Sequence, residues 1–98
     1  MLEKDIERKL VAGVKRTGGK AYKFVSPGNV GVTDRIVIWP NGVIHFVELK
    51  TSKGVLSRLQ GVQARELQKL NQKVFVLKGA DAVVGYLEQF TEEFGVKA

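Results

Sequence analysis

The feature that most constrains the fold is Pro40-Asn41-Gly42, which lies between two runs of apolar, β-branched residues. Proline presets φ for the first turn position, asparagine tolerates the second, and glycine supplies the left-handed third. The pattern predicts a β-hairpin over residues 31–50 with a three-residue loop, in which Trp39 pairs with Val43. Counting outward from that pair sets Ile38 opposite Ile44, Ile36 opposite Phe46 and Asp34 opposite Glu48.

Two carboxylates therefore face each other at the open end of the predicted hairpin. Strand alternation puts Asp34, Glu48 and Lys50 on one face. Like charges directly opposite each other destabilise a sheet. A divalent cation between them turns the repulsion into attraction, and Mg²⁺ is usually held by one or two carboxylates. With Lys50 placed to meet a phosphate oxygen or an attacking water, the arrangement suits metal-assisted phosphodiester hydrolysis.

These residues carry a family resemblance. Asp34, followed after thirteen residues by Glu48-Leu49-Lys50, resembles the PD-(D/E)XK nuclease signature. The order and spacing of residues 26–28, 31–36, 46–50 and 56–60 resemble the VRR-NUC (virus-type replication-repair nuclease) branch, and the likeness covers nearly the whole chain. Thr33 departs from the family pattern, which usually has proline there. The change alters backbone stiffness rather than metal chemistry.

The resemblance implies a Mg²⁺- or Mn²⁺-dependent DNA endonuclease. Asp34, Glu48 and the backbone carbonyl of Leu49 would hold the metal. Lys50 would orient the nucleophile and offset charge in the transition state. Glu7 would assist from an N-terminal helix, although a glutamate at a helix edge is also commonly solvated and paired with a neighbour such as Arg8.

Gln60 has two possible roles. Ser57-Arg58-Leu59-Gln60 is a capping box, in which the serine caps a helix and the glutamine reaches back. In the resembled family, a glutamine at this place orients substrate or water near the metal. We favour the active-site role, with Gln63 as the weaker alternative.

The remaining periodicities complete an α/β fold with a small mixed sheet flanked by helices. Sequential helix, turn and strand after the hairpin form a βαβ crossover, which should be right-handed and place the new strand parallel. The order αβββαβα matches a restriction-endonuclease-like core. The expected elements are helices over residues 2–15, 57–70 and 82–94, the last capped by Asp81, and strands over 20–25 and 73–77. The apolar stripe of the first helix is Leu2, Ile6, Leu10 and Val14. The second helix is expected to turn Leu59, Val62, Leu67 and Leu70 inward, and the third has the stripe Val83, Val84, Leu87, Phe90 and Phe94.

Composition limits the class of protein. The 98 residues suit a single domain, residues 1–98, with no separate DNA-binding module. There is no cysteine, which excludes disulfides and thiolate metal sites. No apolar run approaches the length of a membrane span and the charged N-terminus is no signal peptide, so we expect no membrane association and an intracellular, cytoplasmic location. The resemblance makes a phage or bacterial origin plausible.

The net charge of +6 favours a polyanionic partner, because lysine and arginine displace counterions from phosphates. We expect DNA contacts at Lys23, Ser26, Lys53 and Arg58. The alternative function is a non-catalytic, basic nucleic-acid-binding module with a nuclease-like fold. His45 points to the face opposite Glu48, which argues against a catalytic role.

The size of the chain favours a homodimer that acts on branched DNA such as a four-way junction. One domain carries one metal site and cuts one strand, whereas symmetric cleavage of a junction needs two sites, which a two-fold dimer presents. Stand-alone members of the resembled family are linked with dimerisation and junction cleavage. The apolar residues beyond the needs of one core are Trp39, Val55, Tyr86, Phe90 and Phe94.

Overall fold

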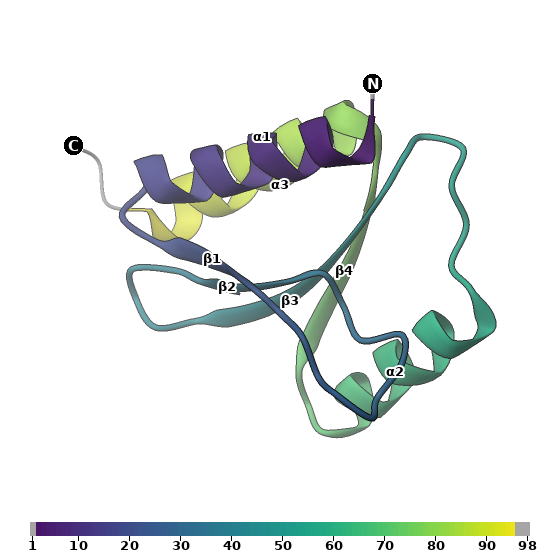
Figure 1. Cartoon of the computed structure of the whole chain (residues 1–98). Coiled ribbons are helices and arrows are strands. Elements are labelled where there is room, and N and C mark those ends of the chain that lie inside the picture. Colours follow the sequence, from purple (N-terminus) through teal and green to yellow (C-terminus); the bar gives the residue numbers. More distant parts are fainter. Residues whose placement is uncertain (1, 96–98) are drawn as a thin grey trace.

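The computed structural model describes residues 2–95, which form one four-stranded sheet and three helices (Figure 1). The sheet order is β1-β2-β3-β4, with β1–β2 and β2–β3 antiparallel and β3–β4 parallel. The mixed sheet and the parallel last strand confirm the predicted α/β architecture. The elements are α1 (Glu3–Arg16), β1 (Lys20–Lys23), β2 (Arg35–Ile38), β3 (Ile44–Lys50), α2 (Arg58–Lys69), β4 (Lys73–Lys78) and α3 (Gly79–Phe94).

The predicted hairpin is present in the predicted register. The Trp39 amide donates to the Val43 carbonyl over 2.9 Å, and the Gly42 amide donates to the Trp39 carbonyl over 2.8 Å. Gly42 has φ +88°, the left-handed conformation that the third loop position requires. Along the strands, Ile38 pairs with Ile44 and Ile36 pairs with Phe46.

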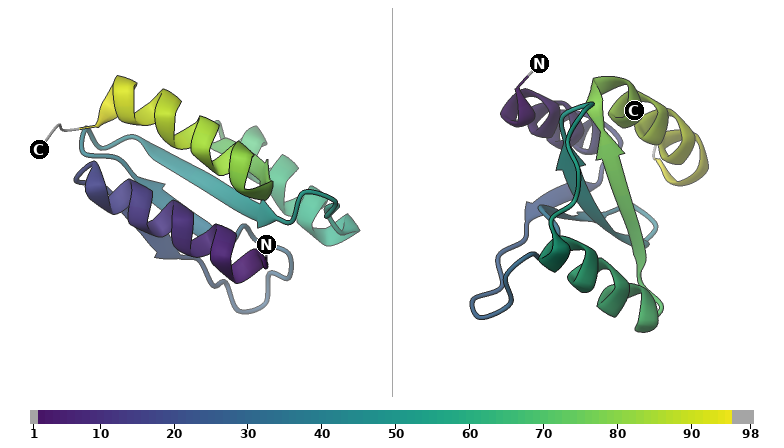
Figure 2. Two further views of the ribbon diagram at one scale, coloured as in Figure 1. Left: turned by 90° about the horizontal axis from the view of Figure 1, so that it is seen from above. Right: turned by 90° about the vertical axis from the view of Figure 1, so that its right-hand side faces the viewer.

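The two faces of the sheet have different surroundings. Helices α1 and α3 lie side by side over one face, whereas α2 lies on the other side (Figures 1 and 2). Because side chains alternate along β3, His45, Val47 and Leu49 are buried beneath α1 and α3. Phe46, Glu48 and Lys50 point to the opposite face. The core is built by Ile6, Leu10, Val14, Val37, Trp39, Val47, Leu49, Leu77, Val83, Tyr86 and Phe90.

Several sequence-based boundaries and burials were wrong. Strand β1 ends at Lys23, two residues before the expected Val25. Helix α3 begins at Gly79, whose φ of +85° lets the chain turn directly out of β4, so Asp81 lies in the first turn rather than at the cap. Leu2 is 62% exposed because it precedes the first turn of α1.

Helix α2 is amphipathic, yet none of its residues is fully buried. Leu59 and Leu70 were expected to face inward but are 43% and 69% exposed. The physical reason is that α2 packs against β4 and leaves the β1–β2 side of this face uncovered. Within residues 2–95, no helix has the length and apolar character that crossing a membrane requires.

The aromatic residues taken from the sequence as a surplus mostly belong to the core. Trp39, Tyr86 and Phe90 are buried and Phe94 packs against them, while Val55 alone of that set is largely exposed. The Trp39 indole donates from Nε1 to His45 Nδ1 over 3.1 Å, and the Tyr86 hydroxyl lies 2.7 Å from the same nitrogen. Burial, followed by the charge of Lys73, lowers the pKa of His45 to about 4. His45 is therefore a neutral core residue, as its strand position indicated.

Candidate active site

The site begins with two carboxylates at the end of the hairpin opposite the loop. Asp34 directly precedes β2, and its Oδ2 accepts a hydrogen bond from the Leu49 amide over 2.7 Å. Glu48, near the end of β3, is only 2% exposed. Burial raises the pKa of Glu48 to about 7, and the negative charge of Asp34 adds to this effect, while Lys50 opposes it. The two carboxylates are therefore close enough to repel each other, as the register predicted.

Lys50 places a positive charge beside this pair. Its Nζ lies 3.7 Å from Glu48 Oε2, and its side chain is only 17% exposed. Strand alternation explains the contact, because residues two apart in β3 share a face. The ammonium group is thus held at the mouth of the site rather than free in solvent.

Gln60 caps helix α2 and also contacts Glu48 of the carboxylate pair, while its role in orienting substrate or water stays a prediction. The Gln60 side-chain oxygen Oε1 accepts a hydrogen bond from the Ser57 backbone amide over 2.8 Å, and the Gln60 backbone amide donates to Ser57 Oγ over 3.1 Å. The two bonds form the capping box of α2. Gln60 Nε2 donates to Glu48 Oε2 over 3.0 Å. The cap therefore fixes the orientation in which the amide reaches the carboxylate.

Gly31 brings the loop before Asp34 against the start of α2. Its φ is +94°, and a β-carbon there would lie 2.6 Å from the carbonyl carbon of Leu59 and 2.8 Å from the Gln60 amide nitrogen. Only glycine satisfies both the backbone conformation and the close approach. The sequence showed Gly31 as part of a motif, but its contact with α2 joins elements far apart in the chain and has no local signal.

One oxygen of the site lacks a partner. Glu48 Oε1 is buried and makes no hydrogen bond in the described part of the chain, whereas Oε2 receives Gln60. A buried carboxylate oxygen without a partner is costly. A divalent cation would satisfy it, and the oxygen donors suit the hard cation Mg²⁺. Because the amide and carbonyl of a strand residue point to the same edge, the Leu49 carbonyl faces the side on which Asp34 binds the Leu49 amide.

In this structure Glu7 pairs with Arg35, and the assisting role at the metal that the resemblance implies stays a prediction. The Glu7 carboxylate accepts from Nε of Arg35 over 3.0 Å and also from Nη2, while Nη1 of Arg35 donates to the Ala21 carbonyl over 3.2 Å. The guanidinium thus engages Glu7. Among residues 2–95, no three His, Cys, Asp or Glu side chains form a set that could hold a metal ion. The α1 glutamate whose charge adds to the rise in Glu48 pKa, after burial and Asp34, is Glu3, one turn before Glu7.

Of the four expected DNA contacts, Lys23 ends β1 and Arg58 begins α2, whereas Ser26 and Lys53 lie in loops. Lys23, Lys53 and Arg58 are exposed, and Ser26 is half-buried and accepts from Asn29 Nδ2 over 3.0 Å. Their placement is compatible with phosphate contacts, which stay a prediction.

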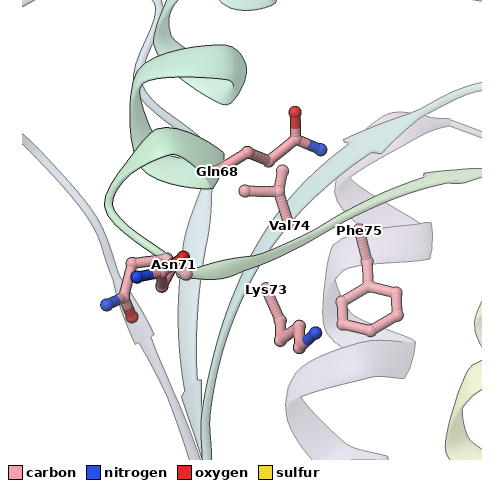
Figure 3. Close-up of a pocket in the computed structure, with 6 residues that line it drawn as sticks. Gln68, Asn71, Lys73, Val74 and Phe75 are labelled. Carbon is pink, nitrogen blue, oxygen red and sulfur yellow. The ribbon is translucent and has the colours of Figure 1, made fainter.

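A separate pocket of about 430 Å³ lies at the turn between α2 and β4 (Figure 3). It is lined by Gln68, Asn71, Gln72, Lys73, Val74 and Phe75. Lys73 pairs with His45, whereas Glu48 pairs with Val76 farther along β4. The pocket therefore belongs to the turn and not to the carboxylate site.

Comparisons with known proteins identify the class of protein to which the chain is similar. No family model matches the sequence. A protein of Acyrthosiphon pisum secondary endosymbiont phage 1, named "Putative nuclease p44", is 46% identical over 79 residues, which cover 81% of this chain and 85% of that protein. A solved structure described as a VRR_NUC domain has 27% identity and a TM-score of 0.83, covering 90% of this chain and 96% of its own. A VRR_NUC domain protein with 19% identity and a TM-score of 0.69, covering 100% of this chain and 93% of its own, shares the fold.

The sequence relative and the structural neighbours point to the same class of protein. The relative carries the name of a nuclease, and both solved structures have the arrangement of sheet and helices found here. The chain belongs to the VRR-NUC family of nuclease domains.

Proposed function

We propose that this nuclease is a Mg²⁺- or Mn²⁺-dependent DNA endonuclease. The observation that carries the proposal is the buried Glu48 Oε1, which makes no hydrogen bond within residues 2–95 although its carboxylate lies beside Asp34 and Lys50. Asp34, Glu48 and the Leu49 carbonyl are the groups that would hold the ion. When bound, such an ion neutralises charge on a phosphate and lowers the pKa of a coordinated water.

The other groups of the site have roles that follow from their contacts. The Gln60 amide holds Glu48 Oε2, which fixes the plane of the carboxylate and keeps Oε1 directed to the site. The Lys50 ammonium stands 3.7 Å from the same carboxylate and is close enough to orient a water and to offset negative charge developing on the phosphate. Neither group needs to change its protonation for these tasks.

We propose DNA, and branched DNA in particular, as the substrate and a homodimer as the active form. The net charge of +6 supports a polyanionic partner. The sheet face that α2 leaves uncovered carries apolar side chains, of which Tyr22 is 46% and Ile44 43% exposed. Tyr22 and Ile44 share that face with Glu48, and a second copy packed there would cover them.

The test is a cleavage assay on duplex, flap and four-way-junction DNA with Mg²⁺, Mn²⁺ or EDTA, using the wild type and Glu48→Gln. We expect metal-dependent cleavage by the wild type only, with paired symmetric cuts in the junction. Binding without cleavage under every metal condition would instead identify a non-catalytic module. Light scattering should give twice the chain mass of 10.8 kDa, and the monomer mass would refute the dimer. Equal or faster cleavage of plain duplex would refute the branch preference.

A further inference from the structure

A groove of about 550 Å³ runs along α1 and is also lined by Arg35 of β2. Lys4, Arg8 and Lys15 line it with exposed cationic side chains. Val11 and Ala12 contribute small apolar surface between them, and the Glu7–Arg35 pair completes the lining. The residues recur at helical spacing, so one face of α1 presents them together.

The groove is strongly positive. Its lining holds four cations (Lys4, Arg8, Lys15 and Arg35) against the single carboxylate of Glu7, which leaves three positive charges. Glu7 is already bound to Arg35 and cannot neutralise the others. Arg8 lies 3.9 Å from Asp5, but both side chains are well exposed, and such surface pairs are weak. A ligand in this groove would therefore meet uncompensated cations.

The groove starts beside the active site. The first turn of α1 and the end of β3 lie at the same end of the molecule (Figure 2), and the charge of Glu3 acts on Glu48. Arg35 directly follows Asp34 in the chain. At a rise of 1.5 Å per residue, Lys15 lies roughly 16 Å along the helix from Lys4. The cations thus lead away from the carboxylates over a length that spans several nucleotides.

We propose that this α1 groove binds the sugar-phosphate backbone of a nucleic acid strand to one side of the bond that is cut. The inference rests on the proposed function and adds a second contact surface to it. Lys4, Arg8 and Lys15 contact phosphates, and the small side chains of Val11 and Ala12 let a sugar approach the helix. These residues lie apart in the sequence from Lys23, Ser26, Lys53 and Arg58, the contacts expected from the sequence.

The test compares two double variants that remove the same charge from the same helix. Lys4→Gln with Lys15→Gln changes the groove. Lys9→Gln with Arg16→Gln is the control, because both of these residues are exposed on α1 and do not line the groove. Binding of a short fluorescent DNA duplex is measured by anisotropy in EDTA, between about 50 and 200 mM salt.

The slope of log K against log[salt] is negative, and each lost phosphate contact should reduce its magnitude by about 0.9. We therefore expect a reduction of about 1.8 for the groove variant and a wild-type slope for the control. Equal changes in both variants, or a wild-type slope in the groove variant, would overturn the proposal. Thermal melts check folding, and the two single groove variants replace the double if it unfolds. A wild type that neither binds nor cleaves DNA would refute the proposed function itself, which is a distinguishable outcome.

Discussion

The Gln60 side-chain amide donates to Glu48 Oε2 over 3.0 Å, although the two residues lie in different elements and Gln60 also completes the cap of α2. The first turn of a helix is thereby tied to a carboxylate of the sheet. A residue that stabilises a helix end and orients an active-site group should show two separable effects when it is changed.

Ser57→Ala removes the capping acceptor and leaves the Gln60 amide in place. We expect the free energy of unfolding to fall by about 1 kcal/mol, as for other lost N-caps, with most of the cleavage rate retained. Gln60→Ala should cost a similar stability and also lower cleavage much further, because the Glu48 carboxylate loses its orienting donor. Urea denaturation and single-turnover cleavage measure the two effects. Equal cleavage by the two variants would show that Gln60 is only a cap.

Gly31→Ala tests the contact between the loop before Asp34 and helix α2, with Gly28→Ala as its control. Both glycines have positive φ, but a β-carbon at Gly28 meets nothing within 4 Å, whereas at Gly31 it lies 2.6 Å from Leu59 backbone. Gly28→Ala should lower the free energy of unfolding by about 1–2 kcal/mol, the energy of holding alanine in the left-handed conformation. Gly31→Ala should cost more and also slow cleavage, because α2 must shift with Gln60. Chemical denaturation and cleavage of both variants check this, and similar values would contradict it.

The parts of the site that lie on the hairpin could be predicted from the sequence, because the Pro-Asn-Gly loop fixes the register and strand alternation fixes the face. Asp34, Glu48 and Lys50 are adjacent for that reason alone. The Glu7–Arg35 pair could not be predicted in the same way. Its partners are 28 positions apart, and their meeting depends on how α1 crosses the sheet, which no local pattern encodes.

In the core, too, some features could be predicted from the sequence and others could not. Periodicity identified the stripes of α1 and α3, but it could not tell that Trp39, Tyr86 and Phe90 surround His45 in one buried cluster. Those rings looked like a surplus because the packing of α3 over the hairpin is a tertiary property. In α2, an apolar stripe suggested burial for Leu59 and Leu70, whereas the helix packs mainly against β4 and both side chains stay exposed.

The stability of the metal-free protein should depend on pH through Glu48. Its pKa of about 7 in the fold exceeds the ordinary 4.5, so the folded state binds the extra proton and loses stability as pH rises from 4.5 to 7. Glu48→Gln lacks this loss and should gain stability relative to the wild type by up to about 1.4 kcal/mol per pH unit over that window. Urea denaturation in EDTA measures the difference. A difference that stays constant with pH would show that the carboxyl titrates normally.

The lowered pKa of His45 changes the stability of the fold with pH in the direction opposite to Glu48. Because burial lowers it to about 4 from 6.5, the unfolded state binds the proton first, and stability falls as pH drops from 6.5 to 4. In the wild type the opposite effects of Glu48 and His45 offset each other, so its free energy of unfolding should change less between pH 4.5 and 6.5 than that of Glu48→Gln. In Glu48→Gln only the His45 effect remains of the two. A variant profile as flat as that of the wild type would contradict the buried, neutral state of His45.

Lys50→Met should abolish most cleavage and leave the fold intact. The methylene stem is kept, while the ammonium group 3.7 Å from Glu48 is lost. We expect a rate at least about 100-fold lower, the size of effect seen when one group that stabilises transition-state charge is removed. Lys69→Met, at an exposed position at the end of α2, is the matched control and should cleave normally. Near wild-type cleavage by Lys50→Met would remove Lys50 from the mechanism.

The most direct test of the metal site is a set of thermal melts with increasing Mn²⁺ for the wild type, Glu48→Gln and the control Glu88→Gln, which changes an exposed carboxylate on α3. A ligand that binds only the folded state adds about 2.7 kcal/mol at a hundredfold excess over Kd. For a domain of this size, that is a rise in Tm of roughly 10–20 °C. We expect this rise in the wild type and in Glu88→Gln, and none in Glu48→Gln. Wild-type melts that coincide across millimolar Mn²⁺, or an equal rise in Glu48→Gln, would contradict a metal site at Asp34 and Glu48.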